Sequence, residues 1–334
     1  MDQNWPVPDW VSPEPEDLGM DRRLLDAYGA WLSEEAGKGA YGTVLVRGGA
    51  IGFEDYGGGG TAESVWEIGS IRKSVAAVLL DIGIQEGKFG LDDRVVDIWP
   101  EIYSLTEEEK DKEIRVRHFA TNTSGWMRDG RPGEEWFYSN AGCTAGHALI
   151  GRAYGLPDDR VAPMAMERVG EAIGASSWSC YHYDRTFDVG NPGQPGPKLA
   201  IDSTVRDTAR FGLLWLRRGR WGKEEVMRAG FARAATTDLT MPLNGCYGYW
   251  WFVNTGQSLL PAAPADTFYS VGIGGEDRRT ILAVVPSLDV VAVVATDAGA
   301  YDILKGYRER PLQLMNDWIG RVIACMPEQE RTFT

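Results

Sequence analysis

The chain has 334 residues, of which 43% are hydrophobic, and its formal net charge at pH 7 is −14. This is enough apolar material for one large domain or two closely associated subdomains. The acidic balance, without a run of Lys or Arg, argues against a nucleic-acid partner, since binding phosphates requires clustered positive charge. The 4 cysteines form no C-x-x-C pair and the 3 histidines are scattered, so neither a disulfide framework nor a metal site is predicted.

The N-terminal stretch, residues 1–19, is acidic and rich in proline, and it lacks the basic and apolar regions of a signal peptide. No uninterrupted apolar segment is long enough to span a membrane. We therefore expect an extended N-terminal arm, no membrane partner and a cytoplasmic location.

Hydrophobic periodicity predicts the first elements of the chain. Apolar residues at helical spacing indicate a helix over residues 20–39. Two strands joined at Gly48-Gly49 follow, because two glycines readily form the tight turn of a hairpin. A second helix is expected to begin at Ser70 and to end at Gly87. Nearly its whole circumference is apolar, which predicts burial on most sides.

The expected secondary structure changes twice after this helix. Residues 88–240 read as helical and rich in loops, with few strand signals and one clear helix at 206–222. Four strands and a terminal helix are then expected, at 246–254, 266–272, 279–286, 289–296 and 312–326. A tight turn between the last two strands predicts an antiparallel pair.

The simplest assembly of these elements is an α+β fold. Residues 1–69 and 241–334 would form one subdomain, a central antiparallel sheet flanked by the terminal helices. Residues 70–240 would form a mostly helical inserted subdomain. An active site is expected in the cleft between the two, with Ser70 where the chain leaves the sheet and enters the first buried helix.

Ser70 and Lys73 are the first candidate catalytic pair. Residues three apart on a helix share a face, so the lysine amine can reach the serine hydroxyl. Burial and the positive end of the helix dipole both destabilise an ammonium, which lets Lys73 accept the proton of a nucleophilic serine. The alternative is that Ser70 is an ordinary helix cap and Lys73 a solvated charge, and the motif alone favours that alternative.

Two later stretches add further candidate groups. A nearby cation can lower the pKa of the Tyr138 phenol from its usual value of about 10, making it a general base. Asn140 offers an amide donor and acceptor, but taken alone this stretch is better explained by an aromatic side chain that packs at a helix start. Gly272 and Gly274, at a strand end, let a substrate approach the backbone, whose N–H groups can stabilise an oxyanion.

In this order, Ser70-x-x-Lys73, Tyr138-x-Asn140 and the glycine turn resemble the serine β-lactamase and penicillin-binding-protein superfamily. Within it, the chain is most similar to class C β-lactamases, family VIII carboxylesterases and 6-aminohexanoate-dimer hydrolases. The resemblance extends from about Leu18 to the last strand, with supporting stretches at 114–126, 132–142 and 203–222.

This resemblance implies a role for each motif residue. Ser70 would be the acyl-accepting nucleophile and Lys73 its proton partner. Tyr138 would be the general base in acylation, and Asn140 would orient Lys73 or the substrate. The backbone N–H groups of Ser70 and Ile273 would form the oxyanion hole. No metal or organic cofactor is implied.

The chain departs from the β-lactamase pattern at Ser270. β-Lactamases carry there a lysine that helps to hold the carboxylate of the antibiotic. Its absence favours ester and simple amide substrates over β-lactams. A small-molecule ester or amide is therefore the expected partner, and no oligomeric state is predicted.

Aromatic and glycine residues near the motifs are predicted to line the substrate pocket: Trp126, Trp136, Tyr181, Trp250, Gly272 and Gly274. For any single aromatic side chain, core packing is the simpler explanation. His182 is not expected to act as a base, because Lys73 and Tyr138 fill that role. Lys198 and Asp202 are expected to face solvent.

The expected function is hydrolysis of small esters or amides through an acyl-enzyme on Ser70. One alternative is an amidase acting on aminohexanoate-type or D-amino-acid amides, and another is a β-lactamase. A binding or sensor protein that retains the fold is the non-enzymatic alternative.

Overall fold

The structure is a computed structural model that describes residues 4–157, 160–183, 196, 198–243, 245–273, 279–297 and 311–327. Its α-helices are α1 (Arg22–Ala36), α2 (Ile71–Gln85), α3 (Val95–Ile98), α4 (Glu101–Thr106), α5 (Val116–Ala120), α6 (Asn140–Ala153), α7 (Ala162–Ala165), α8 (Val205–Leu216), α9 (Ala229–Ala235) and α11 (Pro311–Ala324). Its strands are β1 (Tyr41–Arg47), β2 (Ala50–Gly57), β3 (Trp66–Glu67), β4 (Ser179–His182), β5 (Leu199–Ser203), β6 (Arg220–Trp221), β7 (Glu224–Glu225), β8 (Phe252–Val253), β9 (Phe268–Ile273), β10 (Arg279–Val285) and β11 (Val290–Thr296). Shorter 3-10 turns include η1 (Pro15–Leu18) and η2 (Glu109–Glu113), and η4 (Met166–Gly170) is π-helical.

A 6-stranded sheet joins the two ends of the chain, in the order β2-β1-β11-β10-β9-β8. All of its pairs are antiparallel, and β1 pairs with β11 from Tyr41↔Thr296 to Arg47↔Val290. N-terminal and C-terminal strands therefore share one sheet, which confirms the predicted α+β architecture.

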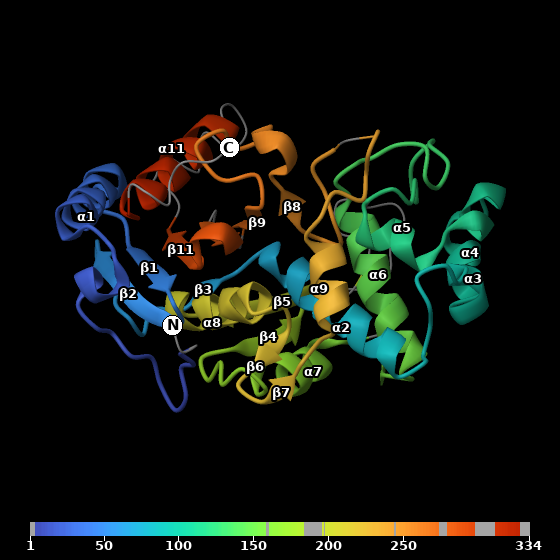
Figure 1. Ribbon diagram of the computed structural model, residues 1–334. Helices are drawn as coiled ribbons and strands as arrows, with labels where there is room; N and C mark the ends of the chain where they lie inside the picture. Colours follow the sequence, from blue (N-terminus) through green and yellow to red (C-terminus); the bar gives the residue numbers. More distant parts are fainter. Residues whose placement is uncertain are drawn as a thin grey trace.

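Alternation along these strands gives the sheet two apolar faces. Leu45 and Val294 belong to a cluster that includes side chains of α1 and α11, whereas Val44 and Val293 belong to the cluster that includes α2 and α8. Figure 1 shows α1 and α11 on one side of the sheet and α8 on the other. The sheet is therefore buried on both faces.

The N-terminal elements form as the sequence predicts. The Asp21 carboxylate caps α1 by accepting a hydrogen bond from the backbone N–H of Leu24 at 3.1 Å. Gly48 and Gly49 have φ of 62° and 80°, as a tight hairpin turn between β1 and β2 requires. Helix α2 is buried from Ile71 to Gly83, and Gly87, with φ of 68°, follows its end.

The middle of the chain contains strands that periodicity did not indicate. β4 and β5 form a 3-stranded sheet with β3, in the order β3-β5-β4, and β6 pairs with β7. Helix α8 ends at Leu216, earlier than expected, because the chain turns there into β6. Most of the helices lie between residues 70 and 240, while the subdomain boundaries themselves stay a prediction.

The prediction of one strand over residues 246–254 is wrong. Only Phe252–Val253 forms a strand, β8, because Trp250 takes a left-handed φ of 56° and bends the chain. Gly248 packs against the end of α9, where a Cβ atom would lie 2.0 Å from the carbonyl oxygen of Ala235. The bend brings Tyr247 opposite Phe252 in an isolated bridge.

Candidate active site

Ser70 lies in a turn between β3 and α2 that is pressed against the end of β9. A Cβ atom on Gly69 would lie 2.4 Å from the backbone nitrogen of Ile273, and one on Gly272 would lie 1.9 Å from the carbonyl oxygen of Ile68. Gly69 also has a left-handed φ of 51°. Only glycine at both positions allows this approach, which holds the backbone of Ser70 beside that of Ile273.

Ser70 occupies the cap position of α2, but its side chain makes no capping hydrogen bond. Its hydroxyl instead meets the amine of Lys73, at 3.0 Å. Within the described ranges, the backbone N–H of Ser70 donates to no other residue. Both groups of Ser70 therefore remain available for chemistry.

Lys73 is at the centre of a compact polar cluster. Its Nζ lies 3.0 Å from Ser70 Oγ, 2.7 Å from the Tyr138 hydroxyl and 2.8 Å from Asn140 Oδ1. The lysine is only 1% exposed, and all three partners are uncharged oxygen atoms. The structure thus brings together two predicted pairs, Ser70 with Lys73 and Tyr138 with Asn140, that are distant from each other in the sequence.

Burial lowers the pKa of Lys73 to about 7, because no partner carries a negative charge to offset the lost hydration. The Asn140 Oδ1 atom can only accept, so it must receive an N–H from Lys73 in either protonation state. When Lys73 is neutral, its lone pair can accept a proton from the Ser70 or Tyr138 hydroxyl. The cluster therefore suits Lys73 to act as a base near neutral pH.

The phenol of Tyr138 does not behave as the motif suggested. Burial raises the pKa of Tyr138 to about 12, and a hydrogen bond with Ser70 opposes this only in part. The nearby cation Arg72 does lower the pKa of Tyr138, but burial outweighs it. A protonated Tyr138 can pass protons but is a poor base at pH 7.

The start of α6 positions Tyr138 and Asn140. Ser139 caps the helix, its Oγ accepting from the backbone N–H of Gly142 at 2.9 Å, and its own N–H donates to Asn122 Oδ1 at 3.1 Å. Asn140 is the first residue of the helix. This capped start fixes the two side chains on either side of Ser139 toward Lys73.

Two aromatic residues that the sequence did not single out enclose Tyr138. The ring of Phe252 stacks on it, with centroids 5.7 Å apart and planes at 15°, and Tyr247 meets it edge-on at 6.3 Å. Trp136 packs against Tyr247 at 5.5 Å. Both missed residues belong to the stretch misread as one long strand, so their convergence depends on the bend at Trp250.

The predicted pocket residues have different surroundings. Trp126 and Trp250 are 1% and 2% exposed and pack in the core, so their predicted contact with substrate has no support from exposure. Trp136 is half-buried beside the Lys73 cluster, and Gly272 is in the contact with Ile68. Gly274 lies outside the described residues.

The sheet β3-β5-β4 presents a polar face next to Ser70. Glu67 is paired with Asp202 across β3 and β5, and the Tyr181 hydroxyl donates to Asp202 Oδ1 at 3.3 Å. Tyr183 donates to Glu67 Oε2 at 2.7 Å. His182 alternates onto the other face, and burial lowers its pKa to about 4.

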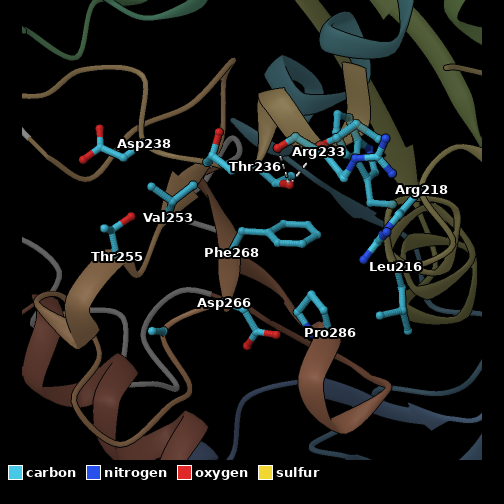
Figure 2. Close-up of a pocket in the computed structure, with 14 residues that line it drawn as sticks. Leu216, Arg218, Arg233, Thr236, Asp238, Val253, Thr255, Asp266, Phe268 and Pro286 are labelled. Atoms are coloured by element: carbon cyan, nitrogen blue, oxygen red, sulfur yellow. Dashed lines mark hydrogen bonds between the residues drawn. The ribbon is translucent and has the colours of Figure 1, made fainter. Parts of the chain in front are cut away.

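A cavity of about 460 Å³ lies on the far face of β8 and β9 from the Phe252–Tyr269 ring pair. Figure 2 shows Phe268 projecting into it, with Arg218 and Asp238 on opposite sides. It contains none of the four residues of the Lys73 cluster, so it is separate from the candidate active site.

Three general properties hold for the described part of the chain. None of its helices is both long and apolar enough to cross a membrane. It contains no group of three or more His, Cys, Asp or Glu side chains arranged to hold a metal ion. The four cysteines, which all lie in the described ranges, form no disulfide, and Cys143, Cys246 and Cys325 are buried.

Comparison with known proteins gives a consistent result. The sequence model of the family described as Beta-lactamase matches residues 22–303. No curated protein matches the chain. A β-lactamase from Sulfitobacter sp. EE-36 is similar in structure, with a TM-score of 0.67 at 16% identity, covering 93% of this chain and 99% of that one.

Two further solved structures share the fold. An octameric penicillin-binding protein homologue from Pyrococcus abyssi has a TM-score of 0.66 at 15% identity, covering 93% of this chain and 79% of that one. A protein assigned as a β-lactamase from Bacteroides dorei DSM 17855 has a TM-score of 0.64 at 17% identity, covering 83% and 91%. The family match over most of the sequence, joined to the shared fold, shows that this chain belongs to the β-lactamase family.

Proposed function

We propose that this protein is a serine hydrolase that acts on small esters or amides through an acyl-enzyme on Ser70. The observation that carries the proposal is the setting of Lys73, a dry amine held by three uncharged oxygen atoms with a pKa lowered to about 7. Membership of the β-lactamase family supports a serine hydrolase in general. The roles of the individual residues are part of the proposal.

In acylation, neutral Lys73 takes the hydroxyl proton of Ser70 while Oγ attacks the carbonyl carbon. The electron pair of the C=O bond moves to oxygen, where the backbone N–H groups of Ser70 and Ile273 stabilise it. As the tetrahedral intermediate collapses, Tyr138 gives its proton to the leaving oxygen or nitrogen and regains one from the Lys73 ammonium. Lys73 is then neutral again, and the acyl group is bound to Ser70.

In deacylation, water takes the place of the leaving group. It loses a proton to Lys73, directly or through Tyr138, as its oxygen attacks the acyl carbon. Collapse returns a proton to Ser70 Oγ and releases the acid. The buried setting favours this sequence because the donors are already oriented and need no reorganisation.

The preference for esters and simple amides over β-lactams rests on Ser270. This residue is on β9, 5% exposed and uncharged, where β-lactamases have a lysine. Rates on matched ester and amide pairs with the same acyl group separate an esterase from the alternative amidase.

The test compares the wild-type protein with Ser70→Ala on a panel of p-nitrophenyl esters, together with intact-mass spectrometry. We expect the wild type to release p-nitrophenol and to carry an acyl adduct on the peptide that contains Ser70. Ser70→Ala should lose both. The matched control is Ser104→Ala, an exposed serine on α4, which should behave as the wild type does.

Undiminished hydrolysis by Ser70→Ala would contradict the proposal. A fluorophosphonate probe addresses the non-enzymatic alternative, because it labels an activated serine without needing the right substrate. Failure of the wild type to react with it, with correct folding shown by circular dichroism, favours a binding or sensor protein that retains the fold.

A further inference from the structure

Lys198 is a cation near the nucleophile that the proposed reaction does not use. It directly precedes β5, and its carbonyl oxygen accepts a hydrogen bond from the N–H of Tyr183 at 3.1 Å, which extends the β4–β5 register by one pair. Side chains alternate along a strand, so Lys198 shares the polar face with Asp202. The opposite face carries Leu199 and Ile201, which are fully buried.

The ammonium of Lys198 has little to hold it. Its one contact of note is with the ring of Tyr183, whose centroid lies 5.0 Å from Nζ. Among the residues that the structure describes, the ammonium of Lys198 donates no hydrogen bond and forms no ion pair. The side chain is half-buried, contrary to the expectation that it faces solvent.

The surroundings of Lys198 make this an unfavourable place for an unpaired cation. Burial and the positive charge of Arg72 lower the pKa of Lys198 to about 8, and Glu67 opposes them without restoring the usual value. Glu67 is itself 6% exposed and receives the hydroxyl of Tyr183. An incoming anion would offset the lost hydration of the ammonium through a charge-assisted hydrogen bond.

Lys198 also adjoins the small sheet β3-β5-β4, whose strand β3 leads to Ser70. Glu67, across the same face, precedes Ser70 by three residues in the chain. The charge of Lys73, whose amine contacts Ser70 Oγ, also lowers the pKa of Lys198, so the two amines lie within electrostatic reach of each other. A substrate with its carbonyl carbon at Ser70 can therefore extend a second group toward Lys198.

We propose that Lys198 binds a carboxylate group of the substrate, so that the enzyme prefers esters that carry a carboxylate over neutral esters of the same length. This rests on the proposed function, because it places the reacting carbonyl at Ser70. Lys198 acts as a specificity residue and takes no part in proton transfer.

The test uses two pairs of esters. Mono-p-nitrophenyl glutarate and p-nitrophenyl pentanoate differ by a carboxylate on the acyl side, and 4-carboxyphenyl acetate and phenyl acetate differ on the leaving side. The measured quantity is the ratio of kcat/KM within each pair, which cancels any general loss of activity. In at least one pair, Lys198→Met should lower the preference for the anionic ester roughly 10- to 100-fold, mainly through KM.

Two variants make this result specific. Lys198→Arg keeps the charge and should retain most of the preference. The matched control is Lys88→Met, because Lys88 is an exposed lysine whose Nζ also lies 5.0 Å from a tyrosine ring, that of Tyr154, beyond the other end of α2. An unchanged ratio in both ester pairs for Lys198→Met, or a wild-type preference for the neutral ester in both pairs, would overturn the inference.

A binding measurement separates failure of the inference from failure of the proposed function. If the wild type hydrolyses none of the four esters, the proposed function is wrong for this class, and glutarate is titrated calorimetrically into the wild type and into Lys198→Met. Binding that weakens at least tenfold in the variant supports the carboxylate site independently of turnover. Equal binding, or none, refutes it.

Discussion

Lys73 and Lys110 are each held by three oxygen atoms, yet their pKa values move in opposite directions. Lys73 contacts a serine hydroxyl, a phenol and an amide, and burial lowers its pKa to about 7. Lys110, in η2, contacts Asp111 Oδ1, Glu108 Oε2 and the carbonyl oxygen of Gly125, each at 3.0 Å. Burial also lowers the pKa of Lys110, but the two carboxylates outweigh it and the net shift is upward.

Because each amine has three oxygen partners, the number of partners does not explain the difference: Lys73 is fully buried among uncharged oxygens, whereas Lys110 is partly buried beside two carboxylates. Neutral oxygens hold the amine in place without stabilising the ammonium, and carboxylates do both. Lys110 is therefore a structural cation that joins η2 to the loop at Gly125. Lys73 is left able to gain and lose a proton near pH 7.

Of the substitutions that test this contrast, Lys73→Met is expected to have the largest effect on activity. It removes the base and leaves the nucleophile without a proton acceptor, so kcat/KM should fall roughly 10²- to 10⁴-fold. The measurement is steady-state hydrolysis of a p-nitrophenyl ester, with Lys110→Met as the control. Activity of Lys73→Met within a few-fold of the wild type would remove Lys73 from the mechanism.

The same two variants should change stability in opposite directions. The pKa of Lys73 is lower in the folded state than its usual value of 10.5, so at pH 7 the unfolded state binds more protons and Lys73 costs stability. After allowance for lost hydrogen bonds, Lys73→Met should gain about 1–3 kcal/mol at pH 7. Lys110→Met should lose roughly 2–4 kcal/mol, because it leaves the buried Asp111 unpaired.

Urea unfolding at several pH values measures the free energy of unfolding of both variants, and so tests whether Lys73→Met is stabilising and Lys110→Met destabilising. The advantage of Lys73→Met over the wild type should shrink as pH rises from 7 toward 10.5, where the unfolded lysine also loses its proton. An advantage that does not depend on pH would mean that the lysine is charged in the folded protein.

Asn140→Asp would convert the surroundings of Lys73 into those of Lys110. It places a carboxylate where Oδ1 now lies 2.8 Å from Nζ, and a charge this close raises a lysine pKa by roughly 1–3 units. In the wild type, kcat/KM should rise with pH to a plateau above about 7, since the base must be neutral.

In Asn140→Asp, the midpoint of that rise should move up by roughly one to two units. Activity at pH 7 should fall roughly 5- to 50-fold and recover in alkaline buffer. A variant that is equally impaired at every pH would show that Asn140 acts only through local structure.

Phe252→Leu should have the smallest effect. Its ring stacks on Tyr138 at 5.7 Å, and such a pair contributes about 0.5–1.5 kcal/mol. We expect kcat to fall roughly 2- to 10-fold, with little change in the pH midpoint, because Lys73 is untouched. Phe231→Leu removes a comparable stack, with Tyr249 at 5.5 Å, and serves as the control. A shift in the midpoint of the pH profile would show that Phe252 also influences the pKa of Lys73.

Local pattern was sufficient for the two hairpins of the 6-stranded sheet and for the buried helix. The β1–β2 hairpin and the β10–β11 pair follow from alternation and turn residues, and the burial of α2 follows from its apolar circumference. β4 and β5 were not predicted because they are short strands in a segment that reads as loops. The stretch 246–254 was misread because a left-handed Trp250 is invisible to periodicity.

The candidate site was predictable in its membership and less so in its electrostatics. The spacing of Ser70 and Lys73 fixes their meeting, and the resemblance to a known superfamily supplied Tyr138 and Asn140. The upward shift of the Tyr138 pKa depends on burial by Phe252 and Tyr247, which the fold alone provides. The position of Lys198 depends in the same way on the unpredicted pairing of β4 with β5.

The contact between Gly69 and Ile273 has a consequence for anyone who sets out to redesign this protein. Any side chain at Gly69 or Gly272 would meet backbone atoms that cannot move aside, 2.4 Å and 1.9 Å from its first carbon. Libraries that include these two positions will consist mostly of misfolded members. The face formed by Tyr181, Lys198 and Asp202 is half-exposed and can be varied without disturbing that joint. Substitutions intended to change substrate preference should therefore be made on this face, and the residues that hold the backbone around Ser70 should be left unchanged.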